Sequence, residues 1–264
     1  MAAAGSYILV HGGGMTARFW DRLVPELDRP ALAVDLPGRN DKPGDLGSLT
    51  VGEEAASVVA DVRRSGIAPP YVVVAHSSGG LVVPEVVAAL APAVSRIVLN
   101  AASVPPEGGC GLDCMKQRHR EGILAALEHG KRTGTTITTP GSPRDPEEFR
   151  SIYGGPPLDD DTLAFVVDRD RCVRDTMHHY LQPVRWSIAS DVPVTYVLNE
   201  LDRPVPPTLQ EAMIARLPRR AAVVPVDTGH IPAVTHAPLL AEIVGRQSSR
   251  RAVTGSRSGR STQP

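Results

Sequence analysis

The sequence predicts an α/β fold in which helices cover both faces of a mostly parallel sheet and a helical insertion lies over one edge of it. Short apolar runs rich in β-branched residues alternate with amphipathic stretches along most of the chain, which is the pattern of strands that are each followed by a helix. One long stretch breaks this alternation. The chain has 264 residues, 42% of them hydrophobic, so it can bury one large core.

The alternating part of the chain divides into strands and helices of ordinary length. The predicted strands are Tyr7–Val10, Ala31–Asp35, Tyr71–Ala75, Arg96–Asn100, Val194–Asn199 and Ala222–Val226. The predicted helices are Ala17–Leu27, Val51–Arg64, Gly80–Leu90, Thr208–Leu217 and Pro238–Gly245. We therefore assign residues 1–103 and 191–245 to one α/β core.

Between these two parts, residues 104–190 lose the apolar period and are interrupted by glycine- and proline-rich turns. A structureless loop of this length is unusual in a compact domain, so we expect a small insertion with helices at Asp113–Gly130 and Asp160–Val184. Because it joins two strands of the sheet, it should form a lid over their carboxyl ends. Residues 246–264 contain five arginines and no acid, and we interpret them as a disordered tail rather than a nucleic-acid-binding arm.

Charge and composition favour a cytoplasmic protein that acts on a small molecule. The formal net charge is −1 and the sequence pI is near 6.7, so no overall field attracts nucleic acid or an anionic membrane. The amino-terminal sequence lacks the basic region of a signal peptide, and no apolar stretch approaches the roughly 20 residues of a membrane helix. Three cysteines do not suggest a disulfide framework. The sequence leaves open whether the protein forms a homodimer.

A candidate nucleophile lies between a predicted strand and a predicted helix. The strand ends at Ala75, the sequence His-Ser-Ser-Gly-Gly follows, and a helix begins at once. A strand, a sharp turn with serine and a helix form a nucleophile elbow, which requires small residues two positions to either side. These positions are Ala75 and Gly79 if Ser77 is the nucleophile, whereas Ser78 would place His76 there. We therefore assign Ser77, and expect the backbone N–H of Ser78 to stabilise an oxyanion.

A glycine run, Gly12–Gly14, follows the first strand. Glycines allow the backbone to approach a ligand closely and to turn its N–H groups inward. No Gly-Lys-Ser/Thr follows, so this is not a phosphate-binding loop, and the third glycine of a dinucleotide fingerprint is absent. We therefore expect no nucleotide cofactor here.

These motifs in this order resemble the α/β-hydrolase superfamily, from Tyr7 to about Gly245. The matching pieces are Ile8-Leu-Val-His-Gly-Gly13, Asp35-Leu-Pro-Gly38, Ala75-His-Ser-Ser-Gly-Gly80, Asp202-Arg-Pro-Val-Pro206 and Gly229-His230. The resemblance implies the α/β-hydrolase fold and Gly13 as the second oxyanion donor, and it does not cover the insertion at the level of residues. By pattern the chain is similar to the compact esterases and hydroxynitrile lyases, but Ile231 stands where the lyases carry lysine, which argues against cyanohydrin cleavage.

The chain order of this fold, serine then acid then histidine, selects the other two catalytic candidates. His230 follows the strand Ala222–Val226, and we favour it over His236 as the base. Asp202 follows the strand Val194–Asn199, and we favour it over Glu200 as the acid that orients the base.

The predicted activity is that of a carboxylesterase-like serine hydrolase that cleaves a small ester, lactone or thioester and needs no cofactor. A cyclase, lyase or acyltransferase with the same triad is the alternative, and so is a ligand-binding receptor or pseudoenzyme of this fold. Cys110, Cys114 and His119 lack a second ligand pair at zinc-site spacing, so we expect no metal. Four aromatic residues are candidates to line the pocket: Tyr153, Phe165, Tyr180 and Trp186.

Overall fold

The computed structural model describes residues 5–139, 143–153 and 158–246. Its core is a six-stranded sheet in which every neighbouring pair is parallel, with the strand order β2-β1-β3-β4-β7-β8. The strands are β1 (Ser6–Val10), β2 (Ala31–Val34), β3 (Tyr71–His76), β4 (Val94–Asn100), β7 (Val194–Asn199) and β8 (Ala222–Val226). All six predicted strands are thereby confirmed, with ends that differ by at most two residues.

The centre of the sheet explains why these runs are so uniformly apolar. β1 is buried along its whole length, and β3 is buried from Val72 to its end. A parallel strand covered on both faces has no solvent side, so it reads as a continuous apolar run rather than an alternating one. In register, Val10 lies beside Ala75, and the loops that follow β1 and β3 therefore leave the sheet side by side.

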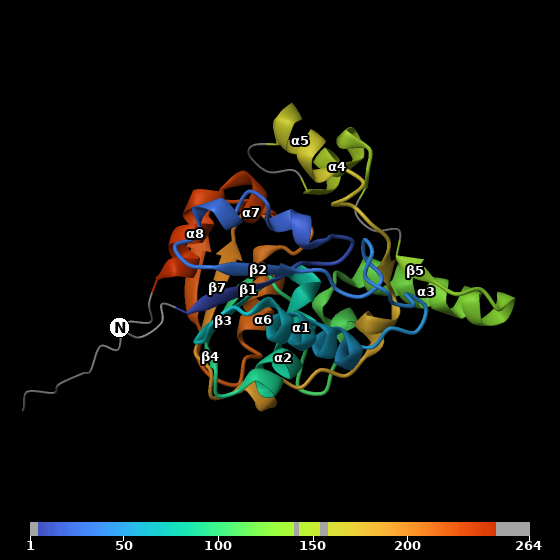
Figure 1. The fold of residues 1–264 in the computed structure, drawn as a ribbon. Helices are drawn as coiled ribbons and strands as arrows, with labels where there is room; N and C mark the ends of the chain where they lie inside the picture. The colour runs from blue at the N-terminus through green and yellow to red at the C-terminus, as the bar shows by residue number, and fades with distance from the viewer. Residues whose placement is uncertain (1–4, 140–142, 154–157, 247–264) are drawn as a thin grey trace, which may run out of the picture.

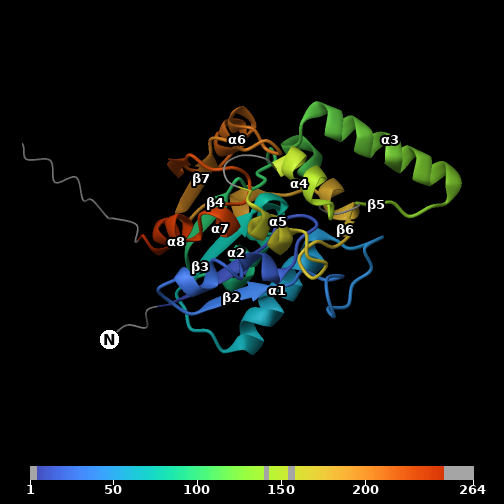
Figure 2. The same ribbon diagram turned by 90° about the horizontal axis from the view of Figure 1, so that it is seen from above.

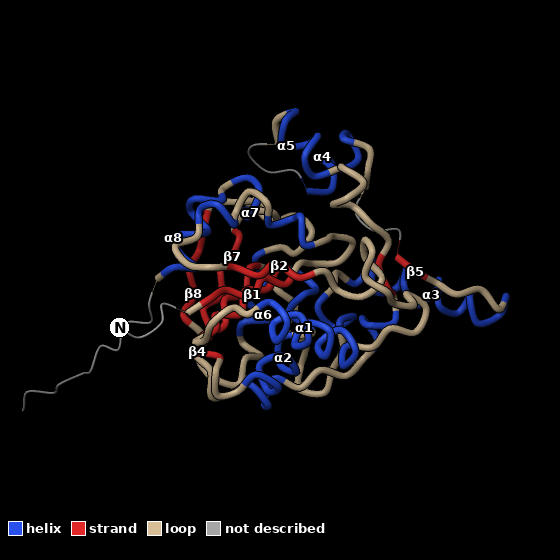
Figure 3. Tube along the Cα trace, viewed as in Figure 1, coloured by secondary structure: helices blue, strands red, loops and turns tan. Residues whose placement is uncertain are grey.

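Helices cover both faces of this sheet (Figures 1 and 3). On one face, α1 (Val51–Ser65), α2 (Val83–Leu90) and α6 (Pro207–Ile214) share a buried cluster with the side chains of Ile8 and Val73. On the other face, α7 (Pro232–Thr235) and α8 (Ala237–Gly245) pack with Tyr7 and Val74. The α/β-hydrolase arrangement of layers is thus as predicted.

α1 illustrates how the sequence sets helix ends. The Thr50 hydroxyl accepts from the Glu53 N–H, and the Glu53 carboxylate accepts from the Thr50 N–H at 2.8 Å, which is a capping box. The helix ends before Gly66, whose φ of 73° is the left-handed conformation that favours glycine. The prediction of Val51–Arg64 is correct to within one residue.

The predicted helix Ala17–Leu27 is wrong. The structure has two short 3-10 helices instead, Ala17–Trp20 and Val24–Glu26. Pro25 lies in the last turn of the predicted helix, where it lacks the N–H that a continuous helix needs. The apolar spacing that suggested a helix comes from Phe19, Trp20 and Leu23. These side chains pack against the sheet without forming a continuous helix.

The predicted helix Asp160–Val184 is also wrong beyond its first turns. Helix α5 covers Asp160–Val166 only, and the chain then forms a short strand, β6 (Asp175–Thr176), and a 3-10 helix, His178–Leu181. The run Asp168–Arg174 is almost entirely polar and offers no apolar face that could hold a longer helix against the core.

The segment between β4 and β7 contains three α-helices among its described residues. They are α3 (Gln117–Thr133), α4 (Pro146–Tyr153) and α5, and β5 (Thr138–Thr139) pairs with β6 in a small antiparallel sheet. α3 replaces the predicted helix Asp113–Gly130 and begins four residues later, after a 3-10 helix at Gly111–Cys114. Figures 1 and 2 show that α3 projects away from the sheet. The domain boundaries and the lid function of 104–190 stay predictions.

Two further points concern the carboxyl-terminal tail and membrane-spanning helices. The predicted tail, 246–264, lies outside the described residues except for Arg246. In the part of the chain that the structure describes, no helix is long and apolar enough to cross a membrane.

Candidate active site

Ser77 stands in a strained turn directly after β3. Its φ is 50°, a left-handed conformation that residues with a side chain rarely adopt. It opens a 3-10 helix, Ser77–Leu81, that leads into α2, and its carbonyl accepts from the Ser103 N–H at 2.8 Å. The predicted elbow is therefore present in the backbone. The N–H groups of this first turn have no acceptor within the helix, so they face outward as an oxyanion site requires.

The elbow leaves no room for a larger residue at Gly79. A Cβ atom there would lie 2.5 Å from the carbonyl oxygen of His11, which is far inside van der Waals contact. The elbow therefore packs directly on the loop that follows β1. The small-residue requirement inferred from the sequence has this contact as its physical cause, and Ala75, on the other side of Ser77, is fully buried.

The structure brings His230 and Asp202 together. The His230 Nδ1–H donates to Asp202 Oδ2 at 2.6 Å, and both residues are buried. Asp202 Oδ1 accepts from the Val205 N–H at 2.7 Å, which fixes the carboxylate in its loop. Because Nδ1 carries the proton, Nε2 of His230 is left as the basic nitrogen. Glu200, the alternative acid, is exposed, and within the described part of the chain the carboxylate that bonds the imidazole is that of Asp202.

Gln210, on α6, holds the loop that carries Asp202 and was not foreseen from the sequence. Its side-chain oxygen accepts from the Asn199 N–H, and its amide group donates to the carbonyls of Asn199 and Val205. The side chain thus ties both ends of the loop together. A buried glutamine on a helix that follows the acid loop is a sequence signal for this role, but a weak one.

The glycine loop after β1 is held from several sides. The His11 Nδ1–H donates to the Gly12 carbonyl at 2.8 Å, and its Nε2 accepts from the Leu36 N–H at 3.3 Å. Burial, and then the nearby Arg39 charge, lower the pKa of His11 to about 4, so the ring is neutral near pH 7. His11 therefore fixes this loop through both ring nitrogens.

A cluster of buried charges, two from the insertion and two from the core, lies against the same loop. Asp175, on β6, accepts from the Gly14 N–H at 2.9 Å and forms an ion pair with Arg39. Arg39 also pairs with Glu54, whose other oxygen accepts from His179 Nδ1 at 2.8 Å. All four side chains are fully buried or nearly so. His179, from the 3-10 helix His178–Leu181, is thus the second side chain that the insertion contributes to this cluster.

The charges in this cluster are mutually stabilised. Burial raises the pKa of Asp175, but Arg39 and His179 outweigh it and the net direction is downward. Burial lowers the pKa of His179, but the Glu54 carboxylate outweighs it and the net direction is upward. Two carboxylates therefore face one guanidinium and one imidazole that tends to be protonated. Such a balance is what allows charges to stay buried.

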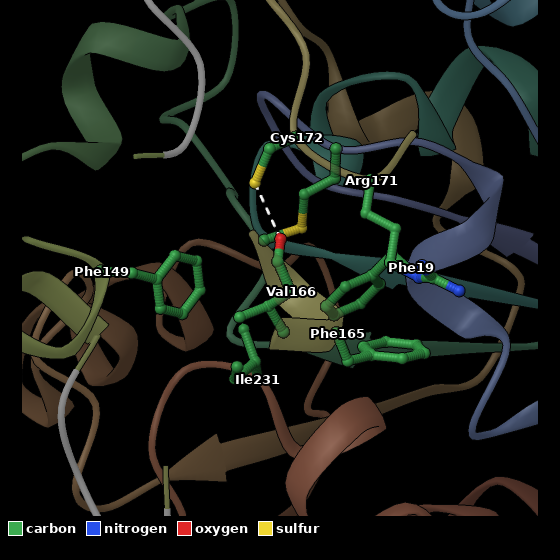
Figure 4. A pocket seen from close by; sticks show the side chains of 8 residues that line it. Phe19, Phe149, Phe165, Val166, Arg171, Cys172 and Ile231 are labelled. Carbon is green, nitrogen blue, oxygen red and sulfur yellow. Dashed lines mark hydrogen bonds between the residues drawn. The ribbon is translucent and has the colours of Figure 1, made fainter. Parts of the chain in front are cut away.

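A narrow apolar pocket lies between the core and the insertion (Figure 4), next to the loop that carries His230, since Ile231 lines it. Its cavity volume is about 10 Å³, and it is lined by Met15, Phe19, Phe149, Phe165, Val166, Arg171, Cys172 and Ile231. Phe165 is held between two guanidinium groups, with Arg171 at 3.9 Å and Arg22 at 4.6 Å from the ring centre. The ring of Tyr153 stacks on Phe149 and lies 5.8 Å from that of His230.

The four aromatic residues proposed to line the pocket lie in different places in the structure. Phe165 lines the pocket and Tyr153 reaches the histidine. Tyr180 lies against Gly13, because a Cβ added to Gly13 would be 2.3 Å from its hydroxyl oxygen. Trp186 does not line the pocket; it is buried in the cluster beneath α2.

Other sequence candidates lie away from the site. His236 is half-buried and contacts the Thr235 hydroxyl. The three cysteines are free thiols, and burial raises the pKa of Cys114 to about 12. Among the described residues, no group of three or more histidine, cysteine or acidic side chains could hold a metal ion.

Comparison with known proteins places the chain among ester-cleaving hydrolases. Residues 7–243 match the model of an alpha/beta hydrolase family. A pimeloyl-[acyl-carrier protein] methyl ester esterase of Methylococcus capsulatus is 27% identical over 250 residues, which cover 90% of this chain and 92% of that enzyme. An esterase of Mycobacterium tuberculosis is 32% identical over 135 residues, but this match covers 49% of this chain and only 42% of that esterase.

Solved structures agree on the fold. An extracellular alpha/beta-hydrolase from a Paenibacillus species superposes with a TM-score of 0.74 at 16% identity, covering 90% of this chain and 96% of that one. Because the family model spans nearly the whole described chain, and the sheet order and elbow agree with it, the chain belongs to the alpha/beta hydrolase family.

Proposed function

We propose that this hydrolase cleaves a small-molecule ester, lactone or thioester through an acyl-enzyme, with Ser77 as nucleophile, His230 as base and Asp202 as the acid that orients it. The observation that carries the proposal is the 2.6 Å contact of His230 with Asp202, on loops at the same sheet edge as the strained Ser77 turn. The esterases among the relatives support the same class of reaction.

The reaction follows from these positions. Nε2 of His230 takes the proton of Ser77 as its oxygen attacks the acyl carbon, and the N–H groups of Gly13 and Ser78 stabilise the resulting oxyanion. When the tetrahedral intermediate collapses, the imidazolium returns its proton to the leaving alkoxide or thiolate. Water, deprotonated by His230, then attacks the acyl-enzyme and releases the acid and free Ser77.

The apolar pocket supports a substrate with one small apolar group. Phe149, Phe165 and Ile231 contribute rings and a branched chain to its lining, whereas the surroundings of Gly13 are polar, with the hydroxyl of Tyr180 and the carboxylate of Asp175. The apolar lining and small volume favour a short apolar acyl or alcohol group. We also propose a cytoplasmic location, which the free cysteines support.

A fluorophosphonate probe tests the proposal. Its phosphorus bonds to an activated serine oxygen with loss of fluoride, and intact-mass measurement reads the adduct. We expect one adduct on the wild type and none on Ser77→Ala. Ser78→Ala is the matched control: it lacks the neighbouring hydroxyl but keeps the backbone N–H, so it should still be labelled. No adduct on folded wild type, or equal labelling of Ser77→Ala, would overturn the proposal.

A panel of p-nitrophenyl esters then tests the substrate class. We expect kcat/KM to be highest for short acyl chains, because the pocket is small, and to fall for chains longer than the pocket can hold. Activity that rises steadily with chain length would contradict the assignment of the pocket. Product analysis with added alcohols or amines separates hydrolysis from acyl transfer.

A further inference from the structure

Asp175 is the side chain by which the insertion holds the glycine loop. Its Oδ2 accepts from the Gly14 N–H at 2.9 Å, and two residues earlier the Val173 N–H donates to the Gly14 carbonyl at 3.0 Å. Both polar groups of Gly14 are therefore bound by one short segment of the insertion. Gly14 itself has a φ of 67°, a conformation in which glycine needs outside contacts to stay fixed.

The carboxylate of Asp175 is itself fixed. Its Oδ1 accepts from the Thr176 N–H at 2.8 Å and pairs with Arg39. Arg39 also donates to the Pro37 carbonyl at 2.7 Å and pairs with Glu54, so its guanidinium is anchored to the core. The oxygens of Asp175 are thus all engaged with donors in the protein. This leaves Asp175 unsuited to take a proton from a substrate, and suited to hold a backbone group in place.

These contacts determine where the Gly13 N–H points. On one side, the peptide between Gly12 and Gly13 is held through its carbonyl by His11. On the other, the peptide between Gly13 and Gly14 is held through its N–H by Asp175. The Gly13 N–H belongs to the first of these peptides, and the second fixes the chain on the other side of the Gly13 Cα. No hydrogen bond from the Gly13 N–H is found within the described ranges. It is therefore available to a ligand and fixed in direction.

We propose that Asp175, anchored by Arg39, is a positioning residue that keeps the Gly13 N–H aimed at the oxyanion of the reaction. The inference rests on the proposed function and extends it, because it makes the insertion part of the catalytic machinery as well as a wall of the pocket. An oxyanion donor is effective only at hydrogen-bonding distance from the position of the developing charge. A loop of three glycines does not hold such a geometry unaided.

Asp175→Asn is the variant that separates this role from others. The amide has one oxygen, so it accepts from Gly14 or from Arg39 but places its NH₂ group against the other donor. Asp170→Asn is the matched control. Asp170 is also an acid of the insertion that pairs with a core arginine, Arg18 at 2.7 Å, but it is half-exposed and has no contact with the glycine loop.

The readout compares a p-nitrophenyl ester with its thionoester, in which sulfur replaces the carbonyl oxygen. Sulfur accepts hydrogen bonds weakly, so the thionoester gains little from the oxyanion donors. For Asp175→Asn we expect kcat on the oxygen ester to fall about 10- to 100-fold, with a much smaller loss on the thionoester. KM should change by less than about twofold, and the acidic limb of the kcat/KM profile should not move. Asp170→Asn should match the wild type on both substrates.

Three results would overturn the inference: an unchanged kcat in folded Asp175→Asn, equal losses on the two substrates, or an equal loss in Asp170→Asn. Thermal unfolding checks each variant. Asp175→Asn leaves the buried Arg39 with only one carboxylate partner, Glu54, and this could prevent folding. In that case the double variant Arg39→Gln/Asp175→Asn, which removes both charges together, takes its place. A wild type that neither labels with fluorophosphonate nor cleaves either ester refutes the proposed function and this inference together. A wild type that does both, beside an Asp175→Asn that behaves identically, refutes the inference alone.

Discussion

His76, the residue just before Ser77, donates its Nε2–H to the main-chain carbonyl of His230 at 2.8 Å. The two imidazole rings lie 4.6 Å apart, and Phe19 stacks on the other side of His76 at 4.7 Å. Burial, and then the proximity of His230, hold the pKa of His76 well below its usual range. A neutral His76 can lie beside His230 when His230 gains a proton. The strand that carries the nucleophile therefore also holds the loop that carries the base.

Replacing His76 with phenylalanine should keep the ring stack and remove the hydrogen bond. We expect the free energy of unfolding to fall by about 1–2 kcal/mol, because the buried His230 carbonyl loses its donor. We expect kcat to fall about tenfold as the base loop loosens. Urea unfolding and steady-state ester hydrolysis measure the two effects. Phe19→Leu is the control, since it disturbs the stack and keeps the donor. A larger loss of kcat in Phe19→Leu than in His76→Phe would contradict this role.

Asp202→Asn should leave the fold intact and abolish most of the activity. The amide cannot hold His230 in the tautomer with a proton on Nδ1, and the corresponding change in a serine triad lowers kcat about 10⁴-fold. Glu200→Gln, two residues away on the same loop, should keep kcat within about twofold of the wild type. Hydrolysis rates of both variants decide between the two acids. A severe loss in Glu200→Gln with an active Asp202→Asn would reverse the assignment.

Gly13→Ala should inactivate the enzyme for steric reasons. The new methyl group would lie 2.3 Å from the hydroxyl oxygen of Tyr180 and 2.9 Å from Asp175 Oδ2, so either the loop or these side chains must move. We expect kcat to fall about 10²-fold or more as the oxyanion donor is displaced. Gly122→Ala, in α3, is the control, because nothing lies within 4 Å of the added atom. It should retain activity and raise stability by about 0.5–1 kcal/mol. A Gly13→Ala enzyme with normal kcat would show that the loop tolerates displacement.

Stability should fall as the pH is lowered from 7 toward 4, partly because of His11. Its pKa is lowered from 6.5 to about 4 in the folded protein. Between these two pH values the residue is therefore protonated in the unfolded chain and neutral in the folded chain. The unfolded state is thereby favoured by about 1.4 kcal/mol per pH unit over this window. His76 acts in the same direction. His179 acts in the opposite direction, because its raised pKa adds stability at low pH that is lost as the pH rises.

Urea unfolding of the wild type and of His11→Asn between pH 4.5 and 7.5 measures this contribution. The asparagine can still donate to Gly12 and accept from Leu36, but it does not titrate. Its free energy of unfolding should therefore depend less steeply on pH than that of the wild type. Parallel curves for the two proteins would show that His11 is not the source.

The strands could be predicted from the sequence because each is a short apolar run, buried on both faces in the centre of the sheet, as in β1 and β3, and partly exposed in the edge strands β2 and β8. Ser77, His230 and Asp202 could be predicted because each follows such a strand, and parallel strands end at one edge. The ester-hydrolase class, read from the same motifs, agrees with the esterases among the relatives. The helix errors arose at Ala17–Leu27, which contains Pro25, and at Asp160–Val184, where the polar run Asp168–Arg174 offers no apolar face.

The contacts that support the site could not be predicted in the same way. Arg39 and Asp175 are 136 residues apart, and nothing in the sequence near either one names the other as its partner. A buried ion pair depends on two distant segments being brought together, and that depends on the path of the whole insertion. The same holds for the hydrogen bond between His76 and the carbonyl of His230. Every residue has a main-chain carbonyl, so the sequence does not indicate which one accepts the bond.

The purely parallel sheet has a consequence for how the enzyme becomes active during folding. A parallel pair cannot be closed by a tight hairpin, and β4 meets β7 only after the whole insertion has been bridged: Ile97 lies beside Val194. Contacts between residues so distant along the chain form slowly. We therefore expect the turn at Ser77 to form with β3 and its neighbours before the segments that bear Asp202 and His230 join the sheet. A partly folded chain would then carry an inert serine, and acyl-transfer reactivity would appear only with the final strands.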